Sequence, residues 1–303
     1  MSGYVCDIQQ FSVNDGYGIR TMVFLSGCSL KCAWCQNPET ISPQPLLMFD
    51  ASKCAGCGLC IEGCPGRCTS RTQDGMIALD RATCNACFEC VSRCVYDARR
   101  ASCRKTSAQE IFSVVKRDEV FFKNTGGGLT LSGGEPLLQS GFCAEILSLT
   151  KDAGIHTAIE TAGNLPFSSF EEVLPFTDLL LYDIKLQNEE AHIKWTGVSN
   201  ARILENFSKL CQSDTEIIVR VPLIPDVNDG QEFCAIVDYV CKCGGSKEIH
   251  ILPYHTVGSY KYQQLGIDYT LEGLRDENDD EVKRCASYAQ SKGLKVSVGG
   301  AGF

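Results

Sequence analysis

The cysteines constrain this chain more than any other feature of its sequence. There are 20 of them among 303 residues, a density that is typical of secreted disulfide scaffolds or of proteins that bind metals through thiolates. Residues 1–11 contain no basic segment, long apolar run or small-residue cleavage site, so we expect no signal peptide. A reduced, cytoplasmic protein whose thiolates bind metals is therefore the better expectation.

Eleven of the cysteines fall into three groups. The first group has the spacing Cys-x3-Cys-x2-Cys, and the other two repeat the spacing Cys-x2-Cys-x2-Cys-x3-Cys. The nine remaining cysteines are scattered, and we expect them to be small buried residues rather than metal ligands. The grouped cysteines are Cys28, Cys32 and Cys35, then Cys54, Cys57, Cys60 and Cys64, and finally Cys84, Cys87, Cys90 and Cys94.

The two four-cysteine runs have the spacing of bacterial two-cluster ferredoxins. In that pattern three thiolates of one run bind one iron–sulfur cube, and the fourth thiolate reaches the other cube. Zinc is the alternative, but it typically takes two separated Cys-x2-Cys pairs per ion, which these duplicated runs do not supply. The predicted ligand sets are Cys54, Cys57, Cys60 and Cys94 for one cluster, and Cys84, Cys87, Cys90 and Cys64 for the other.

Outside this cysteine-rich stretch, apolar strand patterns alternate with helix patterns, which predicts an α/β fold with a parallel sheet. Six such units would fit a barrel or half-barrel as well as a doubly wound sheet, and the pattern does not choose between them. Strands are predicted at residues 21–25, 128–131, 156–161, 179–184, 216–223, 248–253 and, last, 294–298. Helices are predicted at residues 108–119, 141–151, 188–195, 201–211, 231–241 and 279–291.

Residues 51–103, which contain both four-cysteine runs, show little periodicity and no long helix signal. We expect a compact insert here that is folded by its metals. The expected organisation is one α/β domain in two parts, residues 1–50 and 104–303, with the insert between them. No apolar run is long enough to predict a membrane span, and the net charge of −9 argues against nucleic acid as a partner.

The first group differs from the other two because it has only three cysteines. An iron–sulfur cube bound there would leave one iron open to another ligand. The group follows the predicted strand at residues 21–25 and lies in the loop after it. Because βα barrels place their active sites in such loops, we expect this group to be catalytic.

Short motifs in order along the chain resemble those of the radical S-adenosylmethionine (SAM) superfamily and, within it, the glycyl-radical-enzyme activating enzymes. The resemblance covers nearly the whole chain. Tyr17 and Val95 depart from it, since each stands where a proline is usual, but neither is a predicted metal ligand. The motifs are DGYGIR at 15–20, the three-cysteine group, WCQNPE at 34–39, GGGLTLS at 126–132, GGEP at 133–136 and LPYH at 252–255.

The resemblance implies both a fold and an activity. The fold is a partial (β/α)6 radical SAM barrel with an inserted two-cluster ferredoxin-like domain. The activity is the activation of a partner glycyl radical enzyme: reductive cleavage of SAM gives a 5′-deoxyadenosyl radical, which abstracts a hydrogen atom from a glycine Cα of the partner. The implied cofactors are three 4Fe–4S clusters, SAM and a monovalent cation, and the implied reductant is a flavodoxin or a ferredoxin-type protein.

Two alternative functions remain at this point. A radical SAM enzyme that acts on a small molecule would cleave SAM without a glycyl partner, and the motifs at 15–20 and 252–255 count against it. A pure electron carrier would need neither the three-cysteine group nor a large α/β domain. For the insert, relaying electrons and docking the partner both stay open.

The resemblance also implies roles for individual residues, beginning with the catalytic cluster. Cys28, Cys32 and Cys35 would bind that cluster, and SAM would bind its open iron through the amino and carboxylate groups. Gly133 and Gly134 would let the backbone come close to the SAM amino group, because a Cβ there would block the approach.

Five further residues are implied to surround SAM. Trp34 and Gln36 would border the adenine, and His255 would contact the adenosine. Lys185 would lie near the methionine carboxylate, and Asp183 near the ribose or a cation. Both charged residues end a predicted strand, where a barrel places its active-site groups.

Three more polar residues have implied positions at the same strand ends. Glu160 and Thr161 match a ribose or monovalent-cation position of the family, although Glu160 replaces the usual aspartate. Arg220 lies inside a buried-looking strand and needs an anionic partner, for which the SAM carboxylate and a protein carboxylate are equal candidates. The residues implied to contact the glycyl loop of the partner are Asp15, Gly16 and Arg20.

Overall fold

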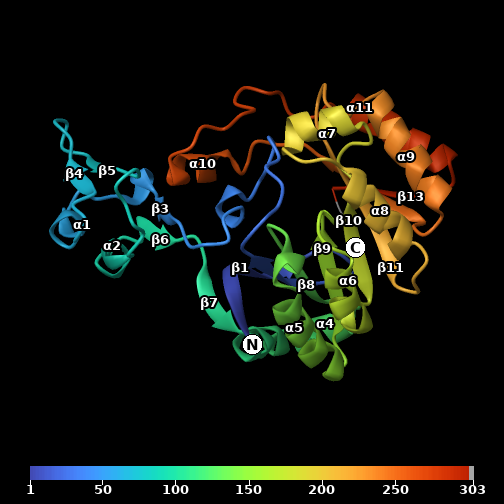
Figure 1. The fold of residues 1–303 in the computed structure, drawn as a ribbon, viewed down its shortest axis with the longest axis horizontal. Coiled ribbons are helices and arrows are strands. Elements are labelled where there is room, and N and C mark those ends of the chain that lie inside the picture. The colour runs from blue at the N-terminus through green and yellow to red at the C-terminus, as the bar shows by residue number, and fades with distance from the viewer. Residues whose placement is uncertain (300–303) are drawn as a thin grey trace.

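The computed structural model describes residues 1–299; residues 300–303, which end the predicted second part of the α/β domain, lie outside it. One sheet has the strand order β13-β12-β11-β10-β9-β8-β2-β1-β7, and neighbouring strands from β2 to β13 run parallel (Figure 1). This confirms the predicted α/β class. The parallel strands are β2 (Arg20–Leu25), β8 (Gly128–Gly133), β9 (His156–Thr161), β10 (Leu179–Asp183), β11 (Glu216–Leu223), β12 (Glu248–Pro253) and β13 (Lys295–Val298).

The sheet is an open barrel rather than a doubly wound sheet. Its strand order follows the chain from β8 to β13 without reversing, whereas a doubly wound sheet reverses its order at a switch point. Within residues 1–299 no ladder joins β13 to β7, so the barrel does not close. No helix in this described part is long and apolar enough to cross a membrane.

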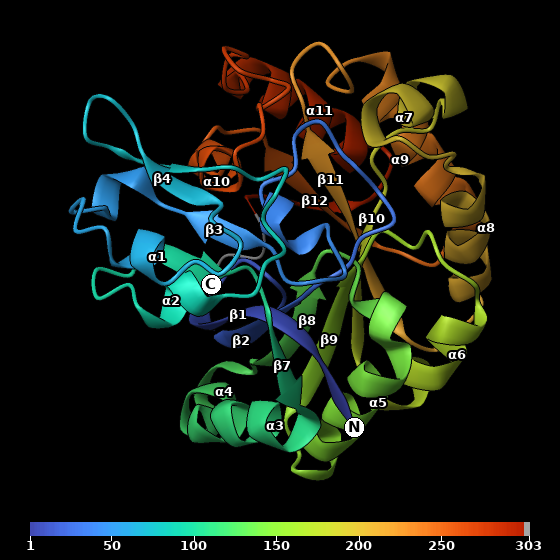
Figure 2. The same ribbon diagram turned by 60° about the vertical axis from the view of Figure 1, so that its left-hand side comes forward.

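The cysteine-rich insert forms a small unit beside the sheet, next to α10 (Ser259–Leu265) (Figure 2). Its elements are as short as the sequence pattern predicts, and β3 pairs with β6 in antiparallel fashion. The insert therefore begins with β3, a few residues before the predicted boundary at residue 51. Its elements are β3 (Leu47–Phe49), α1 (Leu59–Glu62), β4 (Thr69–Arg71), β5 (Ile77–Leu79), α2 (Glu89–Ser92) and β6 (Arg99–Ala101).

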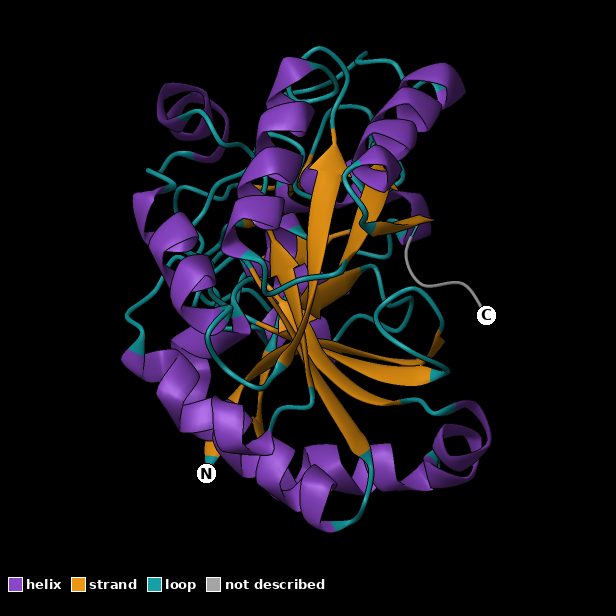
Figure 3. Cartoon of the chain, turned by 90° about the vertical axis from the view of Figure 1, so that its right-hand side faces the viewer, coloured by secondary structure: helices purple, strands orange, loops and turns teal. Residues whose placement is uncertain are grey.

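The longer helices cover the outer side of the curved sheet (Figure 3). In α9 the side chains of Phe233, Ile236, Val237 and Val240 form one buried stripe, as the 3.6-residue period predicts. The helices are α3 (Ala108–Arg117), α4 (Glu119–Thr125), α5 (Ser140–Asp152), α6 (Ser168–Val173), α7 (Glu189–Thr196), α8 (Ala201–Leu210), α9 (Gln231–Cys243) and α11 (Asp279–Ser291). Short 3-10 turns are η1 (Pro38–Thr40), η2 (Ala51–Lys53), η3 (Pro136–Gln139) and η4 (Leu174–Phe176).

The predicted helix at residues 108–119 is two helices that meet at Asp118. Its carboxylate accepts hydrogen bonds from the Thr21 hydroxyl at 2.6 Å and from the Gln10 amide at 2.8 Å. These bonds draw Asp118 toward β2 and interrupt the helix. Gln10 lies in β1 (Ser2–Ser12), which pairs antiparallel with β2 and with β7 (Arg104–Ser107), and the sequence pattern predicts neither of these two strands.

Candidate active site and cluster sites

A cavity of about 700 Å³ opens at the carboxyl ends of the parallel strands. Each of the parallel strands β2, β8, β9, β10, β11 and β12, or the loop after it, contributes to its walls. The sequence-predicted residues that line this cavity are Asp15, Cys28, Cys32, Trp34, Cys35, Gln36, Gly133, Gly134, Glu160, Thr161, Asp183, Lys185, Arg220 and His255. The fold thus brings together every residue predicted to bind the catalytic cluster or SAM.

Backbone hydrogen bonds fix the loop that contains Cys28, Cys32 and Cys35, both within the loop and to α7. The Lys31 N–H donates to the Thr196 carbonyl of α7 at 2.8 Å, and the Cys35 N–H donates to the Cys32 carbonyl at 3.1 Å. Burial raises the pKa of the Cys28 and Cys35 thiols to about 12. Their thiolates therefore need a strong positive partner, and iron is such a partner.

The two glycines after β8 allow two backbone segments to approach closely. At Gly133, with φ +123°, a Cβ would lie 2.3 Å from the backbone of Leu25. At Gly134 a Cβ would lie 2.2 Å from the Gly27 carbonyl oxygen. The structure therefore gives these glycines a role in packing β8 against the start of the cysteine loop, in addition to their position in the cavity wall.

Glu135, which follows the glycines, is fully buried and does not itself line the cavity. Its carboxylate accepts hydrogen bonds from the Thr161 hydroxyl at 2.8 Å and from the Ala162 N–H at 3.0 Å. Burial raises the pKa of Glu135 to about 7. The carboxylate thus fixes the end of β9 against the glycine turn.

One wall of the cavity is lined by opposite charges. The Arg220 guanidinium is 6% exposed and lies 3.2 Å from both the Asp15 and the Glu160 carboxylates. Both partners of Arg220 that the structure shows are therefore protein carboxylates. Beside them the Lys185 ammonium lies 2.7 Å from Asp183. Burial acts to lower the pKa of Lys185, but Asp183, Cys32 and Cys28 together outweigh it, so the net shift is upward.

Two of the three predicted partner-contacting residues are buried in the structure. Arg20 is 0% exposed, and its guanidinium donates to the Leu129 carbonyl and the Thr130 hydroxyl. Gly16 is also buried, and a Cβ there would lie 3.1 Å from the Arg20 side chain. Both residues thus shape the loop before β2 from inside the protein, and the contact of this loop with a partner stays a prediction. Of the three, only Asp15 reaches the cavity.

The opposite side of the cavity is lined by aromatic side chains. Here the cysteine loop meets the loop after β12. Trp34 packs with Tyr254 in a small buried cluster. The Gln36 amide donates to the His255 carbonyl at 2.9 Å, and its carbonyl oxygen accepts from the Gly258 N–H at 2.8 Å. Gln36 thereby ties the cysteine loop to the loop after β12.

Sequence reasoning missed several residues of the cavity wall. Asp276 lies in the irregular segment between α10 and α11 and lines the cavity, but no motif or periodicity marks it. Asn14 also lines the cavity, and its only signal is that it precedes the motif at 15–20.

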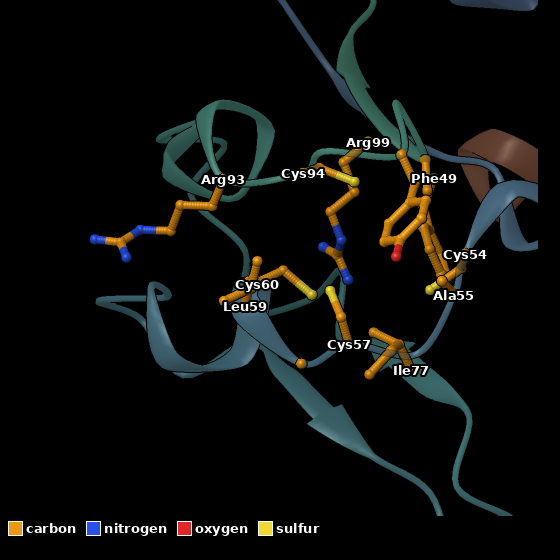
Figure 4. Close-up of a pocket in the computed structure, with 13 residues that line it drawn as sticks. Phe49, Cys54, Ala55, Cys57, Leu59, Cys60, Ile77, Arg93, Cys94 and Arg99 are labelled. Atoms are coloured by element: carbon orange, nitrogen blue, oxygen red, sulfur yellow. The ribbon is translucent and has the colours of Figure 1, made fainter.

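A second, small cavity of about 20 Å³ lies in the insert. Its lining includes Cys54, Cys57 and Cys60 of the first four-cysteine run and Cys94 of the second (Figure 4). This is the set expected when the fourth thiolate crosses between runs. Cys90, from the other predicted set, packs in the same small core as Cys60.

Comparisons with known proteins agree with this geometry. The family model of the radical SAM superfamily matches residues 22–240. The isethionate sulfite-lyase activating enzyme of Desulfovibrio desulfuricans is 39% identical over 270 residues, covering 87% of this chain and 86% of that protein. The 4-hydroxyphenylacetate decarboxylase activating enzyme of Clostridioides difficile is 36% identical, covering 99% and 96%. The (2S)-3-sulfopropanediol dehydratase activating enzyme of Klebsiella oxytoca is 34% identical, covering 98% and 97%.

Among solved structures, Streptococcus suis SuiB bound to the precursor peptide SuiA matches with a TM-score of 0.57. The match covers 91% of this chain and 47% of that one at 12% identity, so it shows a shared fold only.

A parallel half-barrel with three cysteines in the loop after its first parallel strand defines a radical SAM enzyme, which uses SAM and a 4Fe–4S cluster. Within that superfamily, this chain belongs to the glycyl-radical-enzyme activating enzymes. It is thus an oxidoreductase whose reductive cleavage of SAM activates a glycyl radical enzyme, and the small-molecule alternative is not favoured. Neither is a pure electron carrier, since the α/β domain is that of an enzyme.

Proposed function

We propose that Cys28, Cys32 and Cys35 hold the catalytic 4Fe–4S cluster and that SAM binds beside it in the large cavity. When bound and reduced, such a cluster supplies the electron that cleaves the SAM C5′–S bond and produces the hydrogen-abstracting radical. The observation that supports this most is that three thiols from one loop share a cavity of about 700 Å³ with charged and aromatic side chains. Small-molecule sites usually measure about 300–1,000 Å³, so the cavity has room for SAM.

The charged wall suits SAM in particular. Asp183 has one buried carboxylate oxygen without a hydrogen-bond partner, and the Arg220 Nε is buried and also unpaired. Buried polar atoms usually have partners, so these two atoms can serve a ligand: the oxygen can accept from an amino or ribose hydroxyl group. Lys185 can pair with the SAM carboxylate.

The net charge of this cavity wall also supports SAM binding. The carboxylates of Asp15, Glu160 and Asp183 outnumber the cations Arg220 and Lys185. Burial raises the pKa of Glu160, while Arg220 opposes that shift. A wall with excess carboxylate favours the positive sulfonium of SAM, and it would favour a monovalent cation at the ribose edge.

Trp34, Gln36, His255 and the backbone of Gly133 and Gly134 complete the proposed SAM site. The indole and the loop after β12 provide an apolar face for adenine. The glycine turn brings backbone groups to the cavity wall next to the cysteine loop.

We further propose that the insert is a ferredoxin-like domain with two more 4Fe–4S clusters. The shared cavity of Cys54, Cys57, Cys60 and Cys94 supports one of them. The second would use Cys84, Cys87, Cys90 and Cys64, so that the protein binds three clusters. Twenty free cysteines would suit the reducing cytoplasm.

The contacts of α10 favour an electron-relay role for the insert over partner docking. The Tyr262 hydroxyl donates to the Cys35 carbonyl at 2.8 Å. Two residues later, the Gln264 carbonyl accepts from the Arg81 guanidinium of the insert at 2.6 Å. One short helix therefore contacts both the catalytic loop and the insert. The electron donor in this proposal is a flavodoxin or a ferredoxin-type protein.

The partner proposed for this enzyme is a glycyl radical enzyme of the lyase, decarboxylase or dehydratase type, as in the names of the relatives. Asp15 is the residue of the loop before β2 that can meet the substrate segment in the cavity.

The site assignment is tested by SAM cleavage in anaerobically reconstituted protein. Cys32→Ala should abolish the formation of 5′-deoxyadenosine and lower the iron content from about twelve to about eight. Cys241→Ala, at a scattered cysteine, should change neither value. Cleavage retained in Cys32→Ala would contradict the catalytic cluster, and a wild-type iron content near four would contradict the insert clusters.

A further inference from the structure

Arg99 is a buried cation in the insert that the proposed activity does not use. It begins β6, is 2% exposed, and has no carboxylate within ion-pair distance among residues 1–299. One nitrogen of its guanidinium, Nη2, is buried without any hydrogen-bond partner. A buried, unpaired charge is strongly destabilising, so Arg99 needs an anionic partner that the protein alone does not supply.

The neighbours of Arg99 are the cysteines of both predicted cluster sets. Arg99 lines the insert cavity together with Cys54, Cys57, Cys60 and Cys94, and its guanidinium lies among their sulfur atoms (Figure 4). Its Nη1 also lies 3.8 Å from the sulfur of Cys90, in the other set. The side chain thus lies between the two predicted sites.

The Arg99 guanidinium also packs over the Phe49 ring, 4.7 Å from its centre. Neither this aromatic face nor the Cys90 sulfur carries a carboxylate charge that would neutralise the guanidinium, so its charge remains available to a bound anion.

Arg99 has no charged counterpart at the equivalent position in the other half of the insert's internal repeat. Arg99 stands five residues after Cys94, and the equivalent position after Cys64 is Thr69, which is buried and uncharged. Only one of the two halves therefore provides a cation at this position, and it provides it where the halves meet.

We infer that Arg99 is the shared counter-cation of the two insert clusters and raises the reduction potential of both. This inference rests on the proposed two-cluster insert. A cube bound by four thiolates carries net negative charge, which increases when it takes up one electron from the reductant. A nearby buried cation, and hydrogen bonds to the sulfurs, stabilise the reduced form more than the oxidised form. Arg99 would thereby help the insert to accept electrons.

The test measures potentials rather than activity. Full-length protein with Cys28, Cys32 and Cys35 all replaced by Ala contains only the insert clusters, and its iron content should be about eight. In this background we compare Arg99→Met, Arg99→Lys and Arg93→Met by EPR-monitored redox titration. Arg93 is the matched control, since it lines the same cavity wall but is exposed and points away from the sulfurs (Figure 4).

We expect Arg99→Met to lower the equilibrium constant for reduction of each insert cluster by about tenfold or more, which is about 59 mV for one electron. Arg99→Lys should recover part of the loss, and Arg93→Met should leave both potentials unchanged. If Arg99→Met loses insert iron, recovery of that iron in Arg99→Lys supports the inference.

Three results would overturn the inference: unchanged potentials in Arg99→Met, no recovery of potential or iron in Arg99→Lys, or an equal shift in Arg93→Met. An iron content near zero in the parent background would instead overturn the proposed insert clusters. The two failures are therefore distinguishable.

Discussion

The guanidinium of Arg220 in β11 lies 3.2 Å from the carboxylate of Asp15, which is 205 residues away in the loop before β2. Glu160 of β9 lies at the same distance from the same nitrogen. One buried cation therefore joins three segments of the cavity wall. It also offsets the charge of the two carboxylates, which have no other cationic partner within ion-pair distance among residues 1–299.

Replacing Arg220 with Met should destabilise the protein. Removing one partner of a buried ion pair costs about 3–5 kcal/mol, because it leaves the other charge buried and unpaired. Urea unfolding should show this loss in Arg220→Met. The exposed Arg202 of α8 gives a matched control, and equal stability of Arg220→Met and Arg202→Met would contradict the role of the pair.

Gly134→Ala should displace the cysteine loop. The new Cβ would lie 2.2 Å from the Gly27 carbonyl oxygen, and overpacking of this kind costs about 1–3 kcal/mol. We expect the iron content to fall from about twelve to about eight as the catalytic cluster is lost. Gly230 has open space around its Cβ position, so Gly230→Ala should keep its full iron content; loss of iron in both variants would refute the steric explanation.

Tyr262→Phe should weaken the attachment of the cysteine loop to α10. The variant loses the 2.8 Å hydrogen bond to the Cys35 carbonyl, which is worth about 0.5–1.5 kcal/mol. A chelator should therefore remove iron from the catalytic cluster a few-fold faster. Tyr260, on the same helix, is half exposed, and Tyr260→Phe should lose iron at the wild-type rate. Identical rates in all three proteins would show that the bond does not restrain the loop.

The buried carboxyl of Glu135 predicts a pH dependence of stability. Its pKa is raised by burial from 4.5 to about 7, so between these values the folded protein binds a proton that the unfolded chain has lost. The contribution of Glu135 is thus most favourable below about pH 4.5 and weakens as the pH rises through 7, by up to about 1.4 kcal/mol per unit. Urea unfolding across this range should show a flatter slope in Glu135→Gln. Equal slopes in the two proteins would contradict this source of the pH dependence.

The parallel strands could be predicted from the sequence because each is a short apolar run, as in Leu179–Asp183. The main helices could be predicted because their apolar residues recur with the helical period, as in the stripe from Phe233 to Val240. β1 could not be predicted from sequence because only Gly3 and Val5 of its residues are buried, and the others mix polar and apolar types without a regular alternation. The break at Asp118 depends on its tertiary hydrogen bonds to Thr21 and Gln10, which local propensity does not contain.

The candidate site could be predicted where a motif marks a strand end, as it does for Cys28 and Gly133. It could not be predicted where the role depends on tertiary contacts. Arg20 lies in a motif of the loop before β2, but its hydrogen bonds to the β8 backbone bury it completely. Asp276 reaches the cavity from an irregular segment that has no pattern at all.

The most direct measurement is EPR spectroscopy of a partner enzyme after anaerobic incubation with this protein, SAM and a reductant. Each glycyl radical enzyme of the same host is tested as partner, with Cys32→Ala protein and a partner whose radical glycine is replaced by Ala as controls. We predict a glycyl radical doublet on one partner, and its absence in both controls. SAM cleavage at full rate without a doublet on any of these partners would contradict the activating function.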